Sequence, residues 1–329
     1  VLLTPQAMTE IEATAQAVCE LAANTDKPIL TCFMGENKVK PGIDLLIAHG
    51  IPNYAFPERA AKAFRAMADY RRIQSRPEPE FRHYNVDRSA VRALLDQVRK
   101  EDRFSIGDSE ARQILTAYGM RIPRSDVANS PEEAIEIAGR IGYPVVLKIA
   151  SPDILHKTDV GGVKVGLESS EEVRDAFELM VYRAQRYVPE ARIWGCLVQE
   201  MAPRGGIEVL VGMNRDPQFG PLVTFGLGGI YVEVLKDVTF RIAPFSYQDA
   251  QSMLSEIRAH AILDGVRGQP PADKDAIIEV LLRLGQLVQD FPEIVEFDIN
   301  PLIVYPQGQG AVALDMRLVL SKHSGENAA

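Results

Sequence analysis

The chain has 329 residues, a length that suits two or three domains. Its 46% apolar and 25% charged residues are typical of a globular protein, and no window holds the roughly 18 consecutive apolar residues of a membrane-spanning helix. A formal net charge of −9 argues against nucleic acid as a main partner, because phosphate backbones are bound by basic surfaces.

Cys19, Cys32 and Cys196 lack the spacing of a disulfide framework or a zinc site. We therefore expect reduced thiols and a cytoplasmic protein. The chain opens Val-Leu-Leu-Thr-Pro, without Met or a signal peptide. We interpret this opening as the end of a strand, in a fragment of a longer polypeptide.

In the first part of the chain, short apolar runs alternate with helical patterns. Strands are predicted at residues 1–3, 28–33 and 54–56, and helices at 10–23, 42–49 and 57–73. Such alternation is typical of a parallel sheet, so residues 1–74 are predicted to form a partial flavodoxin-like or Rossmann-like α/β domain. The sequence Ser-Arg-Pro-Glu-Pro-Glu then opens a linker predicted over residues 75–105.

The second part is predicted to be an α+β domain, because several strands follow one another and favour antiparallel pairing. Ser130-Pro-Glu-Glu and Ser169-x-x-Glu are capping signals that each start a helix. Other helices are predicted at residues 108–118, 246–263 and 272–289. Strands are predicted at residues 144–148, 163–167, 192–199, 208–213 and 222–225, with an extended segment at 231–241.

A hairpin is predicted near the end of the chain. Residues 296–300 and 312–317 alternate polar and apolar side chains, and Pro306-Gln-Gly-Gln-Gly forms the turn between them. Symmetric pairing about this turn places Asn300 opposite Asp315, with side chains close enough to hold one hard cation. Spacing alone gives equal weight to a Mg²⁺ site and to an ordinary polar hairpin face.

One connection carries both a lysine and a histidine. Lys148 ends an apolar run, and His156 follows in a loop between Pro152 and the pair Gly161-Gly162. Taken alone, Lys148 is interpreted as a surface lysine and His156 as a solvent-exposed histidine. The functional alternative is that Lys148 binds nucleotide phosphates while the His156 loop moves and carries a phosphoryl group.

Two further stretches have the chemistry of a nucleotide site. Gly226-Leu-Gly228-Gly229 could cradle phosphate with backbone N–H groups, although glycine clusters after strands are common turns. Glu200 and Met201 close an apolar strand ahead of Ala-Pro-Arg-Gly-Gly, which predicts a hinge between two lobes. Glu208 starts the next strand.

Together, these stretches resemble the ATP-grasp domain of NDP-forming acyl-CoA synthetases, the acetate–CoA ligase (ADP-forming) family related to succinyl-CoA synthetase. Residues 106–322 resemble the ATP-grasp module, and residues 1–74, with Leu-Thr-Pro-Gln-Ala-Met at 3–8, resemble the succinyl-CoA-ligase-like domain. The implied fold is a partial flavodoxin-like domain followed by a two-lobed ATP-grasp domain. Its lobes would span residues 106–200 and 201–322, with a tail at 323–329.

The resemblance also implies which residues hold the nucleotide. Lys148 would contact the α and β phosphates of ATP or ADP. Backbone groups of Glu200 and Met201 would hold the adenine, and Glu208 would bind the ribose hydroxyls. Gly228 and Gly229 remain the phosphate-cradling candidates.

For the metal and the phosphoryl group, the resemblance implies a second set of residues. Asn300 and Asp315 would bind Mg²⁺. His156, in His-Lys-Thr-Asp-Val-Gly-Gly, matches the second phosphohistidine, which shuttles phosphate between an acyl-phosphate site and ADP. Arg241 lies in a recurrent family segment, and its phosphate-facing role is our hypothesis.

The predicted function is the nucleotide-binding and phosphohistidine-shuttling part of an enzyme catalysing acid + CoA + ATP = acyl-CoA + ADP + Pi. Coenzyme A would bind an upstream domain of the same polypeptide, and we expect a homo-oligomer whose substrates are small molecules. The alternatives are a regulatory, ligand-sensing module of a protein lysine acetyltransferase and an unrelated ATP-grasp carboxylate–amine ligase. Retention of His156 with Asn300 and Asp315 favours catalysis over sensing.

Overall fold

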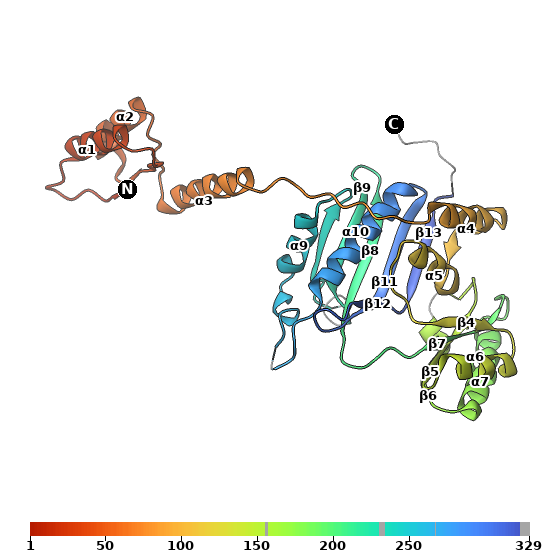
Figure 1. The fold of residues 1–329 in the computed structure, drawn as a ribbon. Helices are drawn as coiled ribbons and strands as arrows, with labels where there is room; N and C mark the ends of the chain where they lie inside the picture. The colour runs from red at the N-terminus through yellow and green to blue at the C-terminus, as the bar shows by residue number, and fades with distance from the viewer. Residues whose placement is uncertain (155–156, 230–233, 267, 323–329) are drawn as a thin grey trace. The chain divides into compact units, whose positions relative to one another are not determined.

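The computed structural model describes residues 1–154, 157–229, 234–266 and 268–322. The predicted tail at 323–329 lies outside these ranges. The chain divides into two compact units, Val1–Glu78 and Pro79–Ala329 (Figure 1). Within the described ranges, no helix combines the length and apolarity needed to cross a bilayer.

The first unit contains a short parallel sheet and its helices. Strands β1 (Leu2–Leu3) and β2 (Cys32–Phe33) pair in parallel, as predicted for this part of the chain. The helices are α1 (Ile11–Ala23), η1 (Glu36–Lys38), α2 (Lys40–Ala48) and α3 (Pro57–Gln74). The prediction of a strand at 54–56 was wrong, because this part of the chain forms only an isolated bridge, between Asn53 and Thr31.

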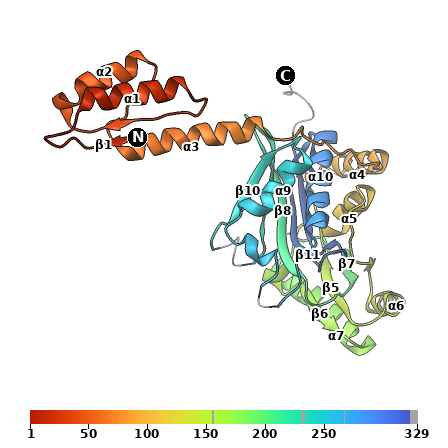
Figure 2. The same ribbon diagram turned by 60° about the vertical axis from the view of Figure 1, so that its left-hand side comes forward.

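A seven-stranded sheet dominates the second unit, in the order β10-β9-β8-β11-β13-β3 with β12 on β11. All of its pairings are antiparallel, as predicted. Its strands are β3 (Ser105–Ile106), β8 (Ile207–Asp216), β9 (Gly220–Leu227), β10 (Val238–Ile242), β11 (Ile294–Val304), β12 (Ala311–Ala313) and β13 (Met316–Leu320). Helices α9 (Tyr247–Glu256) and α10 (Lys274–Asp290) pack on one face, and η3 (His260–Ile262) lies between them in the chain (Figure 2).

Helix α4 (Arg88–Lys100) corrects the predicted linker at 75–105. Val91, Leu95 and Val98 are at most 1% exposed and belong to the hydrophobic core of the large sheet. Their spacing forms one apolar stripe on an otherwise charged helix. The second unit therefore begins at Pro79, and α4 is part of its core together with α5 (Asp108–Ala117).

A smaller antiparallel sheet lies in the same unit, in the order β4-β7-β5-β6. Its strands are β4 (Ser125–Ala128), β5 (Val145–Ala150), β6 (Val163–Leu167) and β7 (Gly195–Glu200). Helices α6 (Pro131–Ile141) and α7 (Ser170–Tyr187) pack on it and bury a second core. Ser130 and Ser169 cap these helices by accepting hydrogen bonds from the backbone N–H groups of Glu133 and Glu172, which confirms both predicted helix starts.

The predicted hairpin and its register are confirmed. Leu302 pairs with Ala313 in β11–β12, and Asp298 pairs with Arg317 in β11–β13. Between these pairs, the Asn300 N–H donates to the Asp315 carbonyl oxygen at 3.0 Å. Asn300 and Asp315 are therefore opposite each other, as the symmetry of the turn predicts.

Candidate functional site

A cavity of about 190 Å³ opens where the hairpin faces the smaller sheet. It is lined by Asn300 and Asp298 of β11, Asp315 between β12 and β13, Asp108 at the start of α5, and Lys157 of η2 (Lys157–Val160). With Arg317 of β13, five charged side chains converge with one amide on a small volume.

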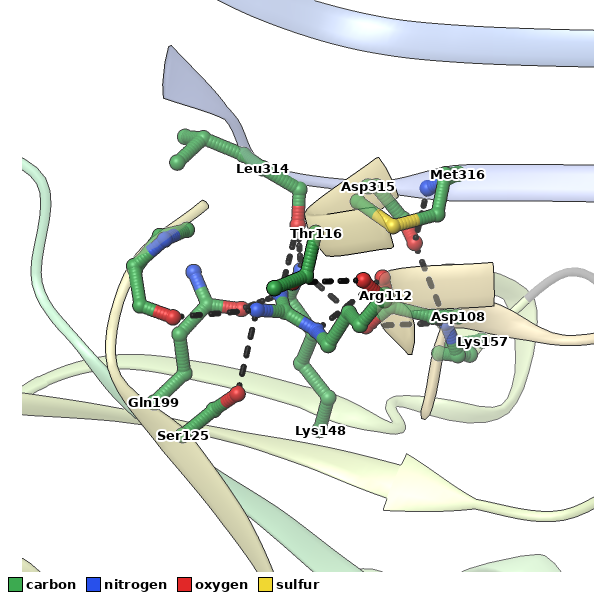
Figure 3. Close-up of polar contacts among 11 residues, drawn as sticks. Asp108, Arg112, Thr116, Ser125, Lys148, Lys157, Gln199, Leu314, Asp315 and Met316 are labelled. Atoms are coloured by element: carbon green, nitrogen blue, oxygen red, sulfur yellow. Dashed lines mark hydrogen bonds and ion pairs between the residues drawn. The ribbon is translucent and has the colours of Figure 1, made fainter. Parts of the chain in front are cut away.

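Lys148 is buried, contrary to the reading of a surface lysine. Its side chain leaves β5 and its Nζ donates to the Leu314 carbonyl oxygen at 2.6 Å, so it links the two sheets (Figure 3). The residue is only 6% exposed. Burial lowers the pKa of Lys148, while the nearby Asp108 carboxylate opposes that shift. An ammonium group has three donors, so the bond to Leu314 leaves donors for a phosphate.

Asp108 is the centre of this charge cluster. It is 3% exposed, and its oxygens lie 3.5 Å from Arg112 Nε and 3.8 Å from the Nζ atoms of both Lys148 and Lys157 (Figure 3). Among the described residues, neither of its oxygens has a hydrogen-bond partner. Asp108 was not predicted as a site residue, because an acidic residue in the first turn of a helix is ordinary.

Lys157 and Asp315 form the outer part of the cluster. Lys157 Nζ lies 3.1 Å from Asp315 Oδ1, which also accepts the backbone N–H of Met316. Asp315 keeps a side-chain exposure of 39%, and Asn300 is exposed. Two oxygen-donating side chains beside a cavity are the donor set that Mg²⁺ uses when phosphates and water complete its shell. Among the described residues, no group of three or more His, Cys, Asp or Glu side chains could hold a metal alone.

Asp298 lies on the same side of β11 as the cavity. Burial raises its pKa, Glu296 adds to the rise, and Arg317 on the neighbouring strand opposes it. Its pairing partner on β8 is Gly212, where an added Cβ would lie 2.6 Å from Asp298 Oδ1. A glycine at 212 therefore makes room for this carboxylate.

The hinge candidates lie where one sheet passes into the other. β7 ends at Glu200, and the chain continues through Met201 to β8 at Ile207. Glu200 donates its backbone N–H to the Arg124 carbonyl oxygen at 2.8 Å, and its carboxylate pairs with the Arg124 guanidinium. The Glu200 N–H is therefore not available to a ligand.

Glu208 and Gly228 meet at the ends of β8 and β9. The Gly228 N–H donates to the Glu208 carbonyl oxygen at 2.7 Å, and an added Cβ at 228 would lie 2.9 Å from the Glu208 Cβ. Gly229 has a positive φ of 61°. The Glu208 side chain is exposed. Neither glycine nor Glu208 lines the cavity described above.

Arg241 is not brought to this cavity. On β10 its guanidinium binds both Glu256 oxygens, at 3.0 and 2.6 Å, and Ser252 Oγ at 2.6 Å, all on α9. Its side chain therefore points to the helix-covered face of the sheet. The structure gives no support to the phosphate-facing role predicted for Arg241, because its donors are engaged in a structural ion pair.

His156 lies outside the described residues, so its predicted mobility and position are not assessed. The segment that follows it is described from Lys157 onward. Gly161 has a φ of 65°, and an added Cβ at Gly162 would lie 2.8 Å from the Lys157 carbonyl oxygen. Glycine is favoured at the two positions for different reasons: the backbone of Gly161 is left-handed, and Gly162 lies close to the Lys157 carbonyl.

Comparison with known proteins shows the family of the chain. The ATP-grasp domain family profile matches residues 97–320. The chain is 39% identical over 319 residues to 4-hydroxybutyrate–CoA ligase [ADP-forming] of Nitrosopumilus maritimus (strain SCM1), covering 97% of this chain and 46% of that protein. It is 46% identical over 236 residues to the beta subunit of acetate–CoA ligase [ADP-forming] I of Pyrococcus furiosus, covering 71% of this chain and all of that subunit.

A solved structure extends the likeness. Acetyl-coenzyme A synthetase 1 of Ca. Korarchaeum cryptofilum superposes with a TM-score of 0.61 at 43% identity, over 70% of this chain and 99% of that chain. That protein is in complex with coenzyme A and Mg-AMPPCP, with its phosphohistidine segment pointing towards the nucleotide binding site. The present chain spans about half the length of single-chain relatives such as the Nitrosopumilus ligase. The chain therefore belongs to the ATP-grasp domain family, in the branch of the ADP-forming acetate–CoA and acyl–CoA ligases.

Proposed function

We propose that this chain is the nucleotide-binding and phosphohistidine-shuttling part of an ADP-forming acyl-CoA synthetase, which joins an acid to coenzyme A at the expense of ATP. Coenzyme A and the acid would bind a partner domain or subunit. The Pyrococcus relative supports this division, because it is named as a subunit and corresponds to 71% of this chain.

One observation carries the proposal: Lys157, Asn300 and Asp315 line a single cavity, and Lys148 Nζ lies 3.8 Å from Asp108 in the wall of the same cavity. Two ammonium groups beside two oxygen donors match a metal-bound polyphosphate, whose oxygens need cations on several sides. Mg²⁺ held by Asn300 and Asp315 would neutralise charge on the β and γ phosphates. Because Lys157 directly follows His156 in the chain, the proposed nucleophile is tethered to a residue that reaches this cavity.

In the proposed step, a neutral His156 nitrogen attacks the γ-phosphorus of ATP. The new N–P bond forms as the bond from the γ-phosphorus to the bridging oxygen breaks, and ADP leaves with the electron pair. Lys148 and Lys157 would hold the phosphate oxygens in place, and their positive charges favour the charge that develops on them. The phosphoryl group then passes to the carboxylate of the acid in the rest of the enzyme, and the step also runs in reverse.

The opposite end of the nucleotide would lie along β7 and β8. The Glu200 carbonyl and the Met201 N–H are the proposed adenine contacts, since the Glu200 N–H is already bound to Arg124. Glu208 would take the ribose hydroxyls, because it is exposed and is the second residue of β8, close after the hinge. Gly228 lies beside Glu208 and is followed by Gly229, and both glycines are proposed to contact the phosphates or the ribose of the nucleotide.

Incubation with γ-labelled ATP and Mg²⁺ tests the proposal. The wild-type chain is expected to take up label that is stable in base and lost in acid, as a phosphoramidate is, and His156→Ala should take up none. His260→Ala is the matched control, because His260 lies in η3, away from the cavity, and should label normally. Label retained after His156→Ala would refute the proposed role of His156 as the phosphoryl carrier. A wild-type chain that binds ATP without labelling would favour the ligand-sensing alternative.

A further inference from the structure

Asp108 has an unusual setting for a carboxylate. It is almost fully buried, and among the described residues neither of its oxygens accepts a hydrogen bond. Its stabilisation comes from Arg112, Lys148 and Lys157, whose nitrogen atoms lie 3.5 to 3.8 Å away. A buried charge is strongly unfavourable without such partners, so Asp108 depends on these three cations.

The three cations are not equivalent. Arg112 is fixed by other contacts, since its guanidinium binds Gln199 Oε1 at 2.5 Å and Ser125 Oγ at 3.1 Å. Lys148 and Lys157 come from different elements, β5 and η2, and each has one other described acceptor, the Leu314 carbonyl and Asp315 respectively. Asp108 is the group that these two lysines share.

We propose that Asp108 is a positioning residue for the phosphate site, a common counter-ion that keeps Lys148 beside Lys157 at the wall of the cavity, which Asp108 and Lys157 line. This inference rests on the proposed function of that cavity. An ion pair at 3.8 Å holds an ammonium group without using one of its hydrogen-bond donors. Both lysines can therefore turn donors to phosphate oxygens while Asp108 keeps them in place.

The charge of Asp108 and its positioning of the lysines have opposite expected effects on ATP affinity. A carboxylate beside a phosphate site repels the anion, so its removal would tighten ATP binding if charge were its only role. If Asp108 positions the lysines, its removal weakens ATP binding, because loss of one hydrogen bond to a charged group lowers affinity by about tenfold or more. A structural role in α5 would change stability and leave ATP affinity intact.

The test is ATP affinity by isothermal titration calorimetry, with Mg²⁺, on the full 329-residue chain. Asp108→Asn is expected to bind ATP at least about tenfold more weakly, and Asp108→Glu, which restores the charge, should recover most of the loss. Glu110→Gln is the matched control. Glu110 is on the same helix and forms a partly buried ion pair with Arg103 outside the cavity, so its loss should lower stability but not ATP affinity.

A second arm asks whether Asp108 acts through the lysines. In a Lys148→Met/Lys157→Met background, Asp108→Asn should have little further effect on ATP affinity. Tighter or unchanged binding in Asp108→Asn, or an equal loss in the double-lysine background, overturns the inference while leaving the proposed function standing. Failure of the wild-type chain to bind ATP would refute both the role of Asp108 and the proposed function. If Asp108→Asn does not fold, Asp108→Ser takes its place with the same expectations.

Discussion

Gly162→Ala probes the segment that joins η2 to β6. The Gly162 N–H donates to the Lys157 carbonyl oxygen at 2.7 Å, and its own carbonyl accepts from the Ile149 N–H at 2.8 Å. Its φ is not in the left-handed region, so alanine is allowed by conformation and only space opposes it. The new Cβ would lie 2.8 Å from the Lys157 carbonyl oxygen and 2.7 Å from Ile149 Cγ2.

The size of the effect follows from these distances. A carbon normally stays roughly 3.3 Å or more from a carbonyl oxygen, so the Lys157 backbone must move by about 0.5 Å. Overpacking of this kind costs about 1–3 kcal/mol, and alanine recovers about 0.4–1 kcal/mol by restricting the unfolded chain. We expect a net loss of about 1–2 kcal/mol in the free energy of unfolding. Lys157 should also be displaced from Asp315, so His156 labelling should slow.

Denaturant unfolding measures the stability change, with Gly139→Ala as its control. Gly139 lies in α6 on the same small sheet, and an added Cβ there meets no atom within 4 Å. Alanine at 139 should therefore stabilise the helix by about 0.5–1 kcal/mol. If Gly162→Ala proved as stable as Gly139→Ala, the close approach to Lys157 would be refuted.

Three further predictions concern separate parts of the chain. Asp315→Asn should weaken Mn²⁺ or Mg²⁺ binding in the presence of ATP by about tenfold or more, an effect that even outer-shell changes reach, and unaltered metal affinity would remove Asp315 from the site. Arg241→Gln should lower the free energy of unfolding by less than about 1 kcal/mol, because the ion pair of Arg241 with Glu256 is partly exposed. A marked loss of ATP affinity in this variant would instead support a role for Arg241 in nucleotide binding. Burial raises the pKa of Cys196 from 9.0 to about 12, so the unfolded chain loses this proton first and stability should fall between those pH values by about 1.4 kcal/mol per unit. Cys196→Ala should flatten that slope, and an equal slope would contradict the assignment.

Elements with a strong local signal were predictable from the sequence. Ser130 and Ser169 carry complete capping signals, and both helices begin where predicted. The pairing of Asn300 with Asp315 followed from symmetry about one turn, because a hairpin with a short loop has few possible registers. The charged helical pattern of α4 was visible in the sequence but was assigned to the linker, although its apolar stripe at every third or fourth residue indicates a helix that packs on a core.

The site was harder to predict because its contacts are distant in sequence. The acceptor of Lys148 is a backbone carbonyl 166 residues away, which no local pattern indicates. Asp108 was missed for the same reason, since its two lysine partners lie on other elements. The phosphate-facing role of Arg241 was our own hypothesis, and its ion pair with α9 depends on which side of β10 faces the helices.

The carbonyl oxygen of Leu314 accepts from both Lys148 and Arg112, at 2.6 and 3.2 Å. The group recognised here is main chain, so it is supplied by any residue at position 314 that keeps the backbone N–H bonded to Pro301. The tolerance of this position to substitution should therefore be wide, whereas adding or deleting one residue between Ala313 and Met316 would turn the carbonyl away and separate the sheets. In homologous chains, the length of this connection should vary far less than its composition.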